Sequence, residues 1–455
     1  MSKTYMYVSS WNEFVGTPGI GLLEYNPENG DMTKIADLEE TLTCNCTALD
    51  KKRNILYITN EIKENPDYVK GGGGLIYAYK IDPATGYLTQ ISRVPACCPC
   101  PAYISLDPTG RYLVCANHSS FFAVTKAVQK EDGTWGMEVV YDDATVDLFE
   151  LNEDGTIGAL VDVSKHTGRK EAFILHSHPH SAIWDPSGRF FACCDKGDDH
   201  IYMYRIDYAA KKLVKMCEPY HDAENSCPRY CVFHPAKPFF FANHERAINV
   251  SAFRYDEGGH LTHINTVNSI PEGFPLPEIK GFLPGQKPGQ QGMAISADGK
   301  YIYNVINGNG ADAVSVFQVD QETGAIAQIQ FLRVEGKWAR GCALSPDGRF
   351  LIVSCLTRTA PCCPSGSRTM EPWRPQASGP AFPAAPTSLS TRRTEHLRKK
   401  RDRQIRSRFL HQCIIRYNSS TGTCFKHENI PLYRHDPPTF PRSTPCAFFR
   451  RPLCN

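Results

Sequence analysis

Apolar and polar positions alternate along most of this chain in a pattern typical of β-strands, and helical periodicity is scarce. A tight turn followed by an apolar, often aromatic, run recurs six times: DKKRNILYITNE (50–61), DPTGRYLVCANH (107–118), DPSGRFFACCDK (185–196), HPAKPFFFANHE (234–245), SADGKYIYNVIN (296–307) and SPDGRFLIVSCL (345–356). The Pro-x-Gly and x-Asp-Gly turns suit short connections between antiparallel strands. The apolar run after each turn predicts a mostly buried strand.

A second pattern follows most of these copies and consists of an alternating strand, a turn and the start of another strand. It reads LIYAYKIDPATGYL (75–88), HIYMYRIDYAAKKL (200–213), NVSAFRYDEGGHL (249–261), AVSVFQVDQETGAI (313–326) and CIIRYNSSTGTCF (413–425). Residues 4–32 carry both patterns in weaker form, which gives seven units. Several short strands per unit, at a period of roughly 50–80 residues, predict an all-β fold: a seven-bladed β-propeller with four-stranded antiparallel blades.

The first unit is short of one strand, so we expect the segment STPCAFF (443–449) to pair with it. N- and C-terminal strands would then close the ring together, and blades that cannot bury their faces alone would be covered on both sides. The prediction is a single domain over residues 1–449, followed by a tail at 450–455.

Two regions depart from the repeat. Residues 118–173 form a long excursion within the third unit, and residues 357–411 form an insertion within the sixth. The first half of the insertion is rich in Pro, Ser and Ala and is predicted to be disordered. The strongly basic part, 392–408, is a candidate nuclear-localisation or nucleic-acid patch. We favour a solvated insert or an error of gene prediction over either of these roles.

Composition limits the partners and the compartment. Of the 455 residues, 50 are basic and 48 acidic, so the net charge of +2 gives no general attraction to nucleic acid or anionic membranes. The N-terminus lacks the apolar core of a signal peptide, and no apolar run is long enough to span a bilayer. Nineteen cysteines, several of them adjacent, favour reduced thiols over a disulfide framework. We therefore expect a cytoplasmic monomer.

Three histidines at alternate positions, His176, His178 and His180 in ILHSHPHSAIWDP, are the main candidates for chemistry. On an extended strand they would project to one face and could ligate a metal. However, Pro179 interrupts strand pairing, and no carboxylate stands at a coordinating spacing. We favour a single histidine used for proton transfer, and predict no metal and no cofactor.

Two cysteine- or glycine-rich stretches carry weaker signals. GGGG (71–74) lacks the Lys-Ser/Thr of a phosphate loop and is read as an inter-strand turn. CCPC (97–100) has no second ligand pair at zinc-finger spacing, so we expect small apolar thiols near strand ends.

The central repeats resemble a known family. HPHSAIWDPSGRFFACCDKGDDHIYMYRID (178–207), the segment PRYCVFHPAKPFFFANHERAINVSAFRYDEGGHLTHINTVNSIPEGFP (228–275) and KHTGRKEAF (165–173) are similar to motifs of the lactonase-type seven-bladed propellers. That family includes 6-phosphogluconolactonases and carboxy-cis,cis-muconate lactonizing enzymes. The resemblance implies an active centre at one end of the propeller, with catalytic residues at the positions of His180, Arg229 and Glu245.

The same resemblance places a further arginine near Asn309, where this chain has none; Arg340 in KWARG is a candidate replacement. Tyr230 stands where the bacterial lactonases usually have histidine, and His244 stands where they have asparagine. We predict His178, Asn309 and Arg340 as substrate-binding residues.

The predicted activity is hydrolysis of a sugar lactone, 6-phosphogluconolactone to 6-phosphogluconate. A histidine can take the proton of the attacking water, a guanidinium can hold an anionic group, and a carboxylate can orient either one. Two alternatives are a cycloisomerase that forms or opens a muconolactone, and a non-catalytic propeller that serves as an interaction platform. A small-molecule lactone is the expected partner.

Overall fold

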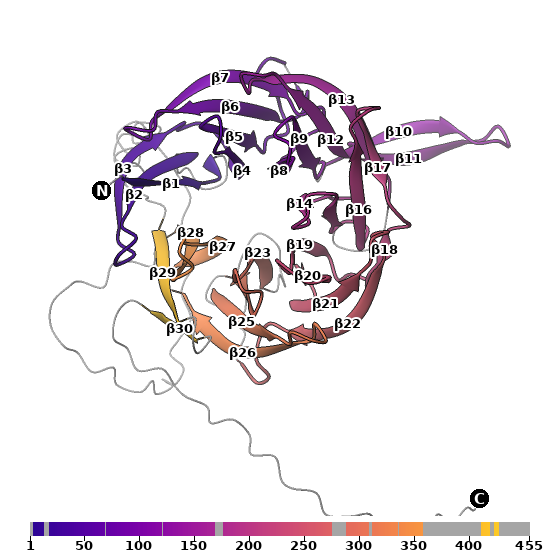
Figure 1. Cartoon of the computed structure of the whole chain (residues 1–455). Coiled ribbons are helices and arrows are strands. Elements are labelled where there is room, and N and C mark those ends of the chain that lie inside the picture. Colours follow the sequence, from indigo (N-terminus) through magenta and orange to yellow (C-terminus); the bar gives the residue numbers. More distant parts are fainter. Residues whose placement is uncertain are drawn as a thin grey trace, which may run out of the picture.

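The protein is built from β-strands arranged as a propeller. The computed structural model describes residues 3–12, 18–68, 70–120, 122–168, 176–274, 288–308, 312–334, 336–357, 411–418 and 423–426. Within them, six sheets contain four strands or more, one contains three, and one hairpin stands alone. Sheets formed by consecutive strands pack around a common centre (Figure 1).

The strands of the first three sheets are β1 (Thr4–Ser9), β2 (Ile20–Tyr25) and β3 (Met32–Leu38); β4 (Cys44–Asp50), β5 (Ile55–Asn60), β6 (Leu75–Ile81) and β7 (Leu88–Pro95); β8 (Pro101–Leu106), β9 (Tyr112–Asn117), β12 (Ala144–Leu151) and β13 (Ile157–His166). The isolated hairpin consists of β10 (Ala123–Gln129) and β11 (Trp135–Tyr141).

The strands of the remaining four sheets are β14 (Ile183–Trp184), β15 (Phe191–Asp195), β16 (His200–Asp207), β17 (Lys212–Lys215) and β18 (Tyr220–His221); β19 (Pro228–Phe233), β20 (Phe239–His244), β21 (Asn249–Tyr255) and β22 (Leu261–Asn268); β23 (Gly289–Ile295), β24 (Tyr301–Asn307), β25 (Ala313–Val319) and β26 (Ile326–Arg333); β27 (Lys337–Leu344), β28 (Phe350–Thr357), β29 (His411–Asn418) and β30 (Thr423–Lys426).

Each four-stranded sheet runs outward from the centre of the ring. The first strands, such as β4, β8, β19 and β23, lie nearest the centre, and the last strands lie at the periphery (Figure 1). Neighbouring first strands pack against each other, as β4 does against β8 and β19 does against β23. Residues at the ends of these strands are therefore brought together from different parts of the chain.

The recurring turns connect the first and second strands of the sheets, as the pattern predicts. Aspartates fix two of them: Asp107 Oδ1 accepts hydrogen bonds from the backbone N–H groups of Arg111 and Tyr112, and Asp185 Oδ1 accepts from Arg189 and Phe190. Such side-chain bonds to nearby N–H groups are the reason why Asp favours turns. The apolar runs after the turns form second strands such as β5, β9 and β20, which are buried throughout.

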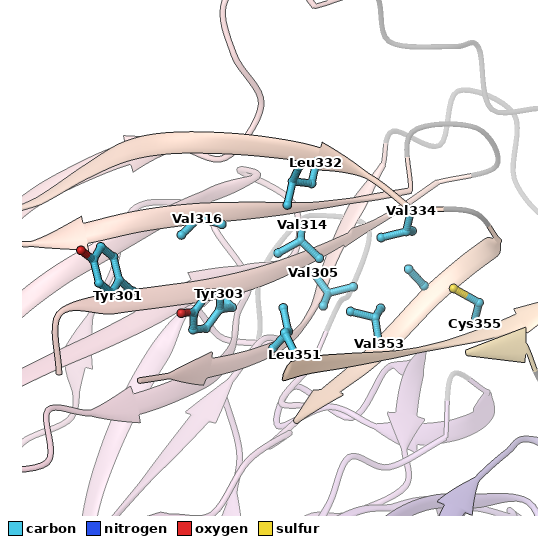
Figure 2. Packing of buried hydrophobic residues seen from close by; sticks show 11 residues of the cluster. Tyr301, Tyr303, Val305, Val314, Val316, Leu332, Val334, Leu351, Val353 and Cys355 are labelled. Carbon is cyan, nitrogen blue, oxygen red and sulfur yellow. The ribbon is translucent and has the colours of Figure 1, made fainter. Parts of the chain in front are cut away.

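The hydrophobic core lies between the sheets. Six clusters of buried residues each join two neighbouring sheets. Figure 2 shows one of them, in which Val305 and Val314 of one sheet face Leu351 and Val353 of the next. No sheet could bury both of its faces alone, so the repeats stabilise one another through these interfaces.

The first and last sheets also touch each other. The rings of Tyr25 and Phe350 meet edge-on with 6.4 Å between centroids, and Arg349 donates a hydrogen bond to the carbonyl of Pro27. The β1–β3 sheet has three strands, and β1 stands where the other sheets have their second strand. In the described part of the chain β1 pairs with β2 only, whereas second strands elsewhere have two partners. The segment 443–449, predicted to pair with the first unit, lies outside the described residues.

The predicted extent of the excursion, residues 118–173, is wrong. Only the hairpin β10–β11 leaves the sheet, and it projects outward from the ring (Figure 1). Strands β12 and β13 follow it and supply the two outer strands of the β8–β9 sheet. The sequence ATVDLFELNEDGTI (144–157) is thus a copy of the second pattern, displaced by the inserted hairpin.

The insertion in the last sheet connects two neighbouring strands. β28 pairs directly with β29, and Cys355 lies opposite His411. Residues 358–410, for which disorder and a basic patch are predicted, lie outside the described residues. No disulfide joins two cysteines within the part of the chain that the structure describes. No helix in the described part is long and apolar enough to cross a membrane.

Candidate active site

Four titratable side chains occupy one position of the repeat. Each is the residue directly after the second strand of its sheet: Glu61 after β5, His118 after β9, Lys196 after β15 and Glu245 after β20. Because the strands have the same register in each sheet, these residues meet at the same end of the ring. Glu61, His118 and Lys196 are buried and Glu245 is partly buried, which is unusual for titratable side chains unless they are paired.

His180 and Arg229 occupy a second shared position. Pro179 lies opposite Asp195, and Pro228 lies opposite His244, so the next residue in each case stands at the same place in its sheet. A β-bulge follows Pro228, and bulges re-aim side chains at the ends of sheets. The fold therefore directs an imidazole and a guanidinium toward the second-strand ends described above.

Arg229, Lys196 and Glu245 form a compact charged cluster. Lys196 Nζ lies 3.1 Å from Glu245 Oε2, and Arg229 Nε lies 3.0 Å from the same oxygen. The first contact is a hydrogen bond; the second is an ion pair without good hydrogen-bond direction. Burial alone would raise the pKa of Glu245, but the two cations lower it to about 2. The carboxylate thus stays ionised at any working pH.

His180 is buried beside this cluster and is held by its backbone. Its N–H donates to the carbonyl of Cys194 at 2.8 Å, and its ring stacks on His118 with 5.6 Å between centroids. Within the described residues its Nδ1 has no hydrogen-bond partner. Desolvation, with the charges of Arg229 and Lys196, moves the pKa of His180 well below its usual value. The imidazole is therefore neutral near pH 7 and keeps a basic nitrogen.

His176 and His178 pack against each other. Their Nδ1 atoms are 3.0 Å apart, and His176 Nε2 lies 3.1 Å from the carbonyl oxygen of Ser120. Burial lowers the pKa of both histidines. The hairpin contributes here, because the Tyr141 ring meets the edge of His176. In the described part of the chain, no group of three or more His, Cys, Asp or Glu residues is arranged to hold a metal ion.

A buried chain of polar groups supports the histidine loop from behind. Asp195 Oδ1 accepts hydrogen bonds from the backbone N–H groups of His178 and Gly197. Its other oxygen lies 2.8 Å from His166 Nδ1, and His166 Nε2 lies 2.8 Å from the hydroxyl of Tyr204. This network fixes the path of the loop that carries His178 and His180.

Arg340 reaches the same end of the ring from β27. Its guanidinium lies over the Trp11 indole, 3.5 Å from the centroid. Burial, with the charge of Arg229, lowers the pKa of Arg340 to about 10, and the negative charge of Glu61 opposes this shift. Arg340 and Arg229 are therefore close enough for their charges to interact. Asn309, the other predicted substrate-binding position, lies outside the described residues.

Tyr230 and His244, the two residues that differ from the family pattern, both have side-chain contacts in the structure. Tyr230 contacts His180 and Arg229, two of the predicted catalytic residues. Its ring meets the His180 ring edge-on with 5.4 Å between centroids, and Arg229 Cζ lies 4.7 Å from the Tyr230 ring centroid. His244 is a structural residue, since Nδ1 lies 2.7 Å from Asn249 Oδ1 and Nε2 contacts the carboxylate of Asp222.

Known proteins match both the sequence and the fold. The family model described as "Lactonase, 7-bladed beta-propeller" matches residues 5–359. This chain belongs to that lactonase propeller family. A 6-phosphogluconolactonase of Bacillus subtilis is 25% identical over 358 residues, which are 78% of this chain and 88% of that protein. One from Formosa agariphila is 22% identical over 77% of this chain and 88% of its own.

Solved structures show the same fold as this lactonase-family chain. A periplasmic gluconolactonase of Pseudomonas aeruginosa superimposes with a TM-score of 0.62 and 24% identity, covering 77% of this chain and 88% of that one. A protein from Lactobacillus plantarum superimposes with a TM-score of 0.65 and 18% identity, covering 93% and 95% of the two chains.

Three titratable residues at this end of the lactonase-family protein are not among the residues predicted from the sequence: Lys196, His118 and Glu61. His118 Nε2 lies 2.7 Å from Glu61 Oε1, and its ring stacks between His178 and His180. The signal was present in the repeat, because TNE, ANH, CDK and NHE end the four corresponding copies. Aligning the copies at their turns would have placed the four titratable residues in one column.

Proposed function

We propose that this protein hydrolyses a sugar lactone, with 6-phosphogluconolactone as the first candidate. The observation that carries the proposal is that Arg229, which is ion-paired with Glu245, lies close enough to His180 for its charge to lower the pKa of that histidine. Membership of the lactonase family and the names of the two bacterial relatives support the choice of reaction.

His180 acts as the general base. Hydrolysis of a lactone begins when water attacks the ring carbonyl, and a neutral imidazole can take the water proton during that step. The lowered pKa of His180 keeps the imidazole neutral, and its Nδ1 has no partner in the described residues. An anionic substrate would offset the nearby positive charges and thereby stabilise the imidazolium that forms.

Arg229 binds the substrate, and Glu245 orients Arg229. The guanidinium of Arg229 binds the phosphate of the substrate or the oxyanion that forms at the carbonyl. Glu245, with a pKa of about 2, is too weak a base to accept a proton, so it positions Arg229 through their ion pair. Arg340 adds a second guanidinium for the phosphate, and His178 and Asn309 complete the substrate-binding residues.

The completed ring belongs to the same proposal. We assign the β1–β3 sheet as the seventh blade and STPCAFF (443–449) as its missing first strand, next to the edge of β1 that has no partner in the described part. We also propose a cytoplasmic monomer that needs no cofactor; its balanced charge and its adjacent cysteines, which favour reduced thiols, support the compartment.

The test is hydrolysis of freshly prepared 6-phosphogluconolactone by the purified full-length chain, with the spontaneous rate subtracted. We expect a clear excess rate, and a loss of about 100-fold or more in kcat/KM for His180→Ala. His260→Ala is the matched control, because His260 is exposed and pairs only locally with Asp256. No excess rate, or equal rates for the wild type and His180→Ala, would refute the proposal.

A further inference from the structure

The hydrolysis proposed above needs a proton donor as well as a base. When the tetrahedral intermediate collapses, the ring oxygen leaves as an alkoxide unless it receives a proton. We propose that Lys196 is the general acid that protonates this oxygen. The inference rests on the proposed lactonase function, but it concerns a residue and a step that the function alone does not assign.

The position of Lys196 carries the argument. Its backbone N–H donates to the carbonyl of His178 at 3.2 Å, so it lies beside the histidine loop. Its side chain, only 7% exposed, extends to the neighbouring sheet, where Nζ lies 3.1 Å from Glu245 Oε2. The ammonium group therefore lies close enough to the proposed base and to the proposed anion-binding arginine for their charges to interact. A buried lysine is rare unless it is paired, and pairing here leaves it in the middle of the site.

The other groups of the cluster are poor donors. Glu245 carries no proton at neutral pH, because its pKa is about 2. A guanidinium does not serve as a proton donor in proteins, which leaves out Arg229. Burial raises the pKa of the Tyr230 hydroxyl, which makes it a weaker acid. His180 is neutral and is already used as the base. Of the groups that contact or flank the Arg229–Glu245 pair in the described residues, Lys196 is the one that carries a positive charge with a transferable proton.

The electrostatic surroundings make Lys196 a better acid than an ordinary lysine. Desolvation is the main cause that lowers its pKa, and the charge of Arg229 acts in the same direction. Glu245 opposes the shift, and Cys227 opposes it more weakly. His178 and His180, on the adjacent segment, are neutral and add no charge. Glu245 thus keeps the lysine protonated in the resting enzyme while the site lowers the cost of losing that proton.

The proton balance of the step is complete. Water attacks the carbonyl carbon and gives one proton to His180. This attack forms the new C–O bond and leaves an oxyanion on the former carbonyl oxygen. The C=O bond then re-forms, the bond from carbon to the ring oxygen breaks, and Nζ of Lys196 gives that oxygen a proton. The new carboxylic acid returns a proton to the neutral lysine, and His180 loses its proton to solvent. One lactone and one water become a hydroxycarboxylate and a proton.

Lys196→Arg is the decisive variant, because it keeps the positive charge and removes the acid. We expect kcat on 6-phosphogluconolactone to fall at least 100-fold in Lys196→Arg and in Lys196→Met. Lys212→Met is the matched control, since Lys212 is exposed and forms its ion pair with Asp162 away from the cluster. Lys196→Arg activity within threefold of the wild type would show that only the charge matters and would overturn the proposal.

Two further readouts separate a chemical role from a structural one. With an aryl lactone such as dihydrocoumarin, whose phenolate leaves without help, the loss in Lys196→Met should be much smaller than with the sugar lactone. An equal loss on both substrates, with normal folding, contradicts the proposal. The wild-type kcat should also decline as pH rises through the lowered pKa of Lys196, and Lys196→Arg should lack that decline. A wild type with no lactonase activity would instead refute the proposed function.

Discussion

The Glu245 carboxylate stabilises the fold as well as the site, and its removal gives a measurable test. Glu245→Gln keeps the size of the side chain and removes the charge that two buried cations share, Lys196 and Arg229. Removing one partner of a buried ion pair leaves an uncompensated charge, which is the costly way to break it.

The magnitude follows from the pKa of Glu245. A shift from 4.5 to about 2 corresponds to about 3 kcal/mol of preference for the ionised form in the folded state, at 1.36 kcal/mol for each pKa unit. The side chain is 20% exposed, so solvent screening makes this an upper value. Loss of the Lys196 proton in the variant would relieve part of the cost. We expect Glu245→Gln to lower the free energy of unfolding by about 2–3 kcal/mol at pH 7.

The pH dependence distinguishes this cause from a packing defect. Because the pKa of Glu245 is depressed on folding, its stabilisation is complete above pH 4.5 and is lost as the pH falls toward 2. The difference between wild type and variant should therefore shrink to about 1 kcal/mol at pH 3.

Urea unfolding at pH 7, 5 and 3 measures the difference directly. Glu150→Gln is the matched control, because Glu150 forms an ion pair with Lys211 on the surface and should cost less than about 1 kcal/mol. A Glu245→Gln cost equal to that of Glu150→Gln, or a cost that does not change between pH 7 and pH 3, would refute the reasoning.

Three other predictions concern regions outside the cluster. Burial raises the pKa of Asp147 to about 7, so wild-type stability should decline relative to Asp147→Asn as pH rises from about 4 to 7, by up to about 4 kcal/mol in urea unfolding. Phe241→Ala, in the core between two sheets, should cost about 3–5 kcal/mol, and a change below 1 kcal/mol would contradict the packing described. Replacing residues 358–410 by a short turn should leave the melting temperature within about 3 °C, since β28 and β29 already pair; a large drop would show that the insertion stabilises the ring.

Much of the fold could be predicted from the sequence because the repeat encodes it locally. The turn aspartates and the apolar runs depend on neighbours within a few residues, and both appear in the structure where the pattern places them. The pattern failed at residues 118–173, where a hairpin separates the second and third strands of one sheet. An inserted hairpin has the same alternation as the strands around it, so periodicity alone could not tell β10 and β11 from β12 and β13.

The candidate site was only partly predictable, for a different physical reason. His180, Arg229 and Glu245 were singled out one motif at a time, and the contacts between them depend on packing between sheets. Lys196 and Glu245 are 49 positions apart in the sequence, and their ion pair exists only because neighbouring sheets share one register. No local pattern in CDK, which ends at Lys196, or in NHE, which ends at Glu245, indicates that contact.

The repeated register also explains how a symmetrical scaffold makes an asymmetrical site. Equivalent positions after four second strands hold Glu61, His118, Lys196 and Glu245, so the backbone geometry is reused while the side-chain chemistry changes at each step. The members of the column pair with one another: His118 lies against Glu61, and Lys196 lies against Glu245. Each pair sets a nitrogen group against a carboxylate, and both pairs act on His180: the His118 ring stacks on it, and the charge of Lys196 lowers its pKa. Substituting one member of the column therefore changes both the stability of a pair and the proton affinity of the histidine between them.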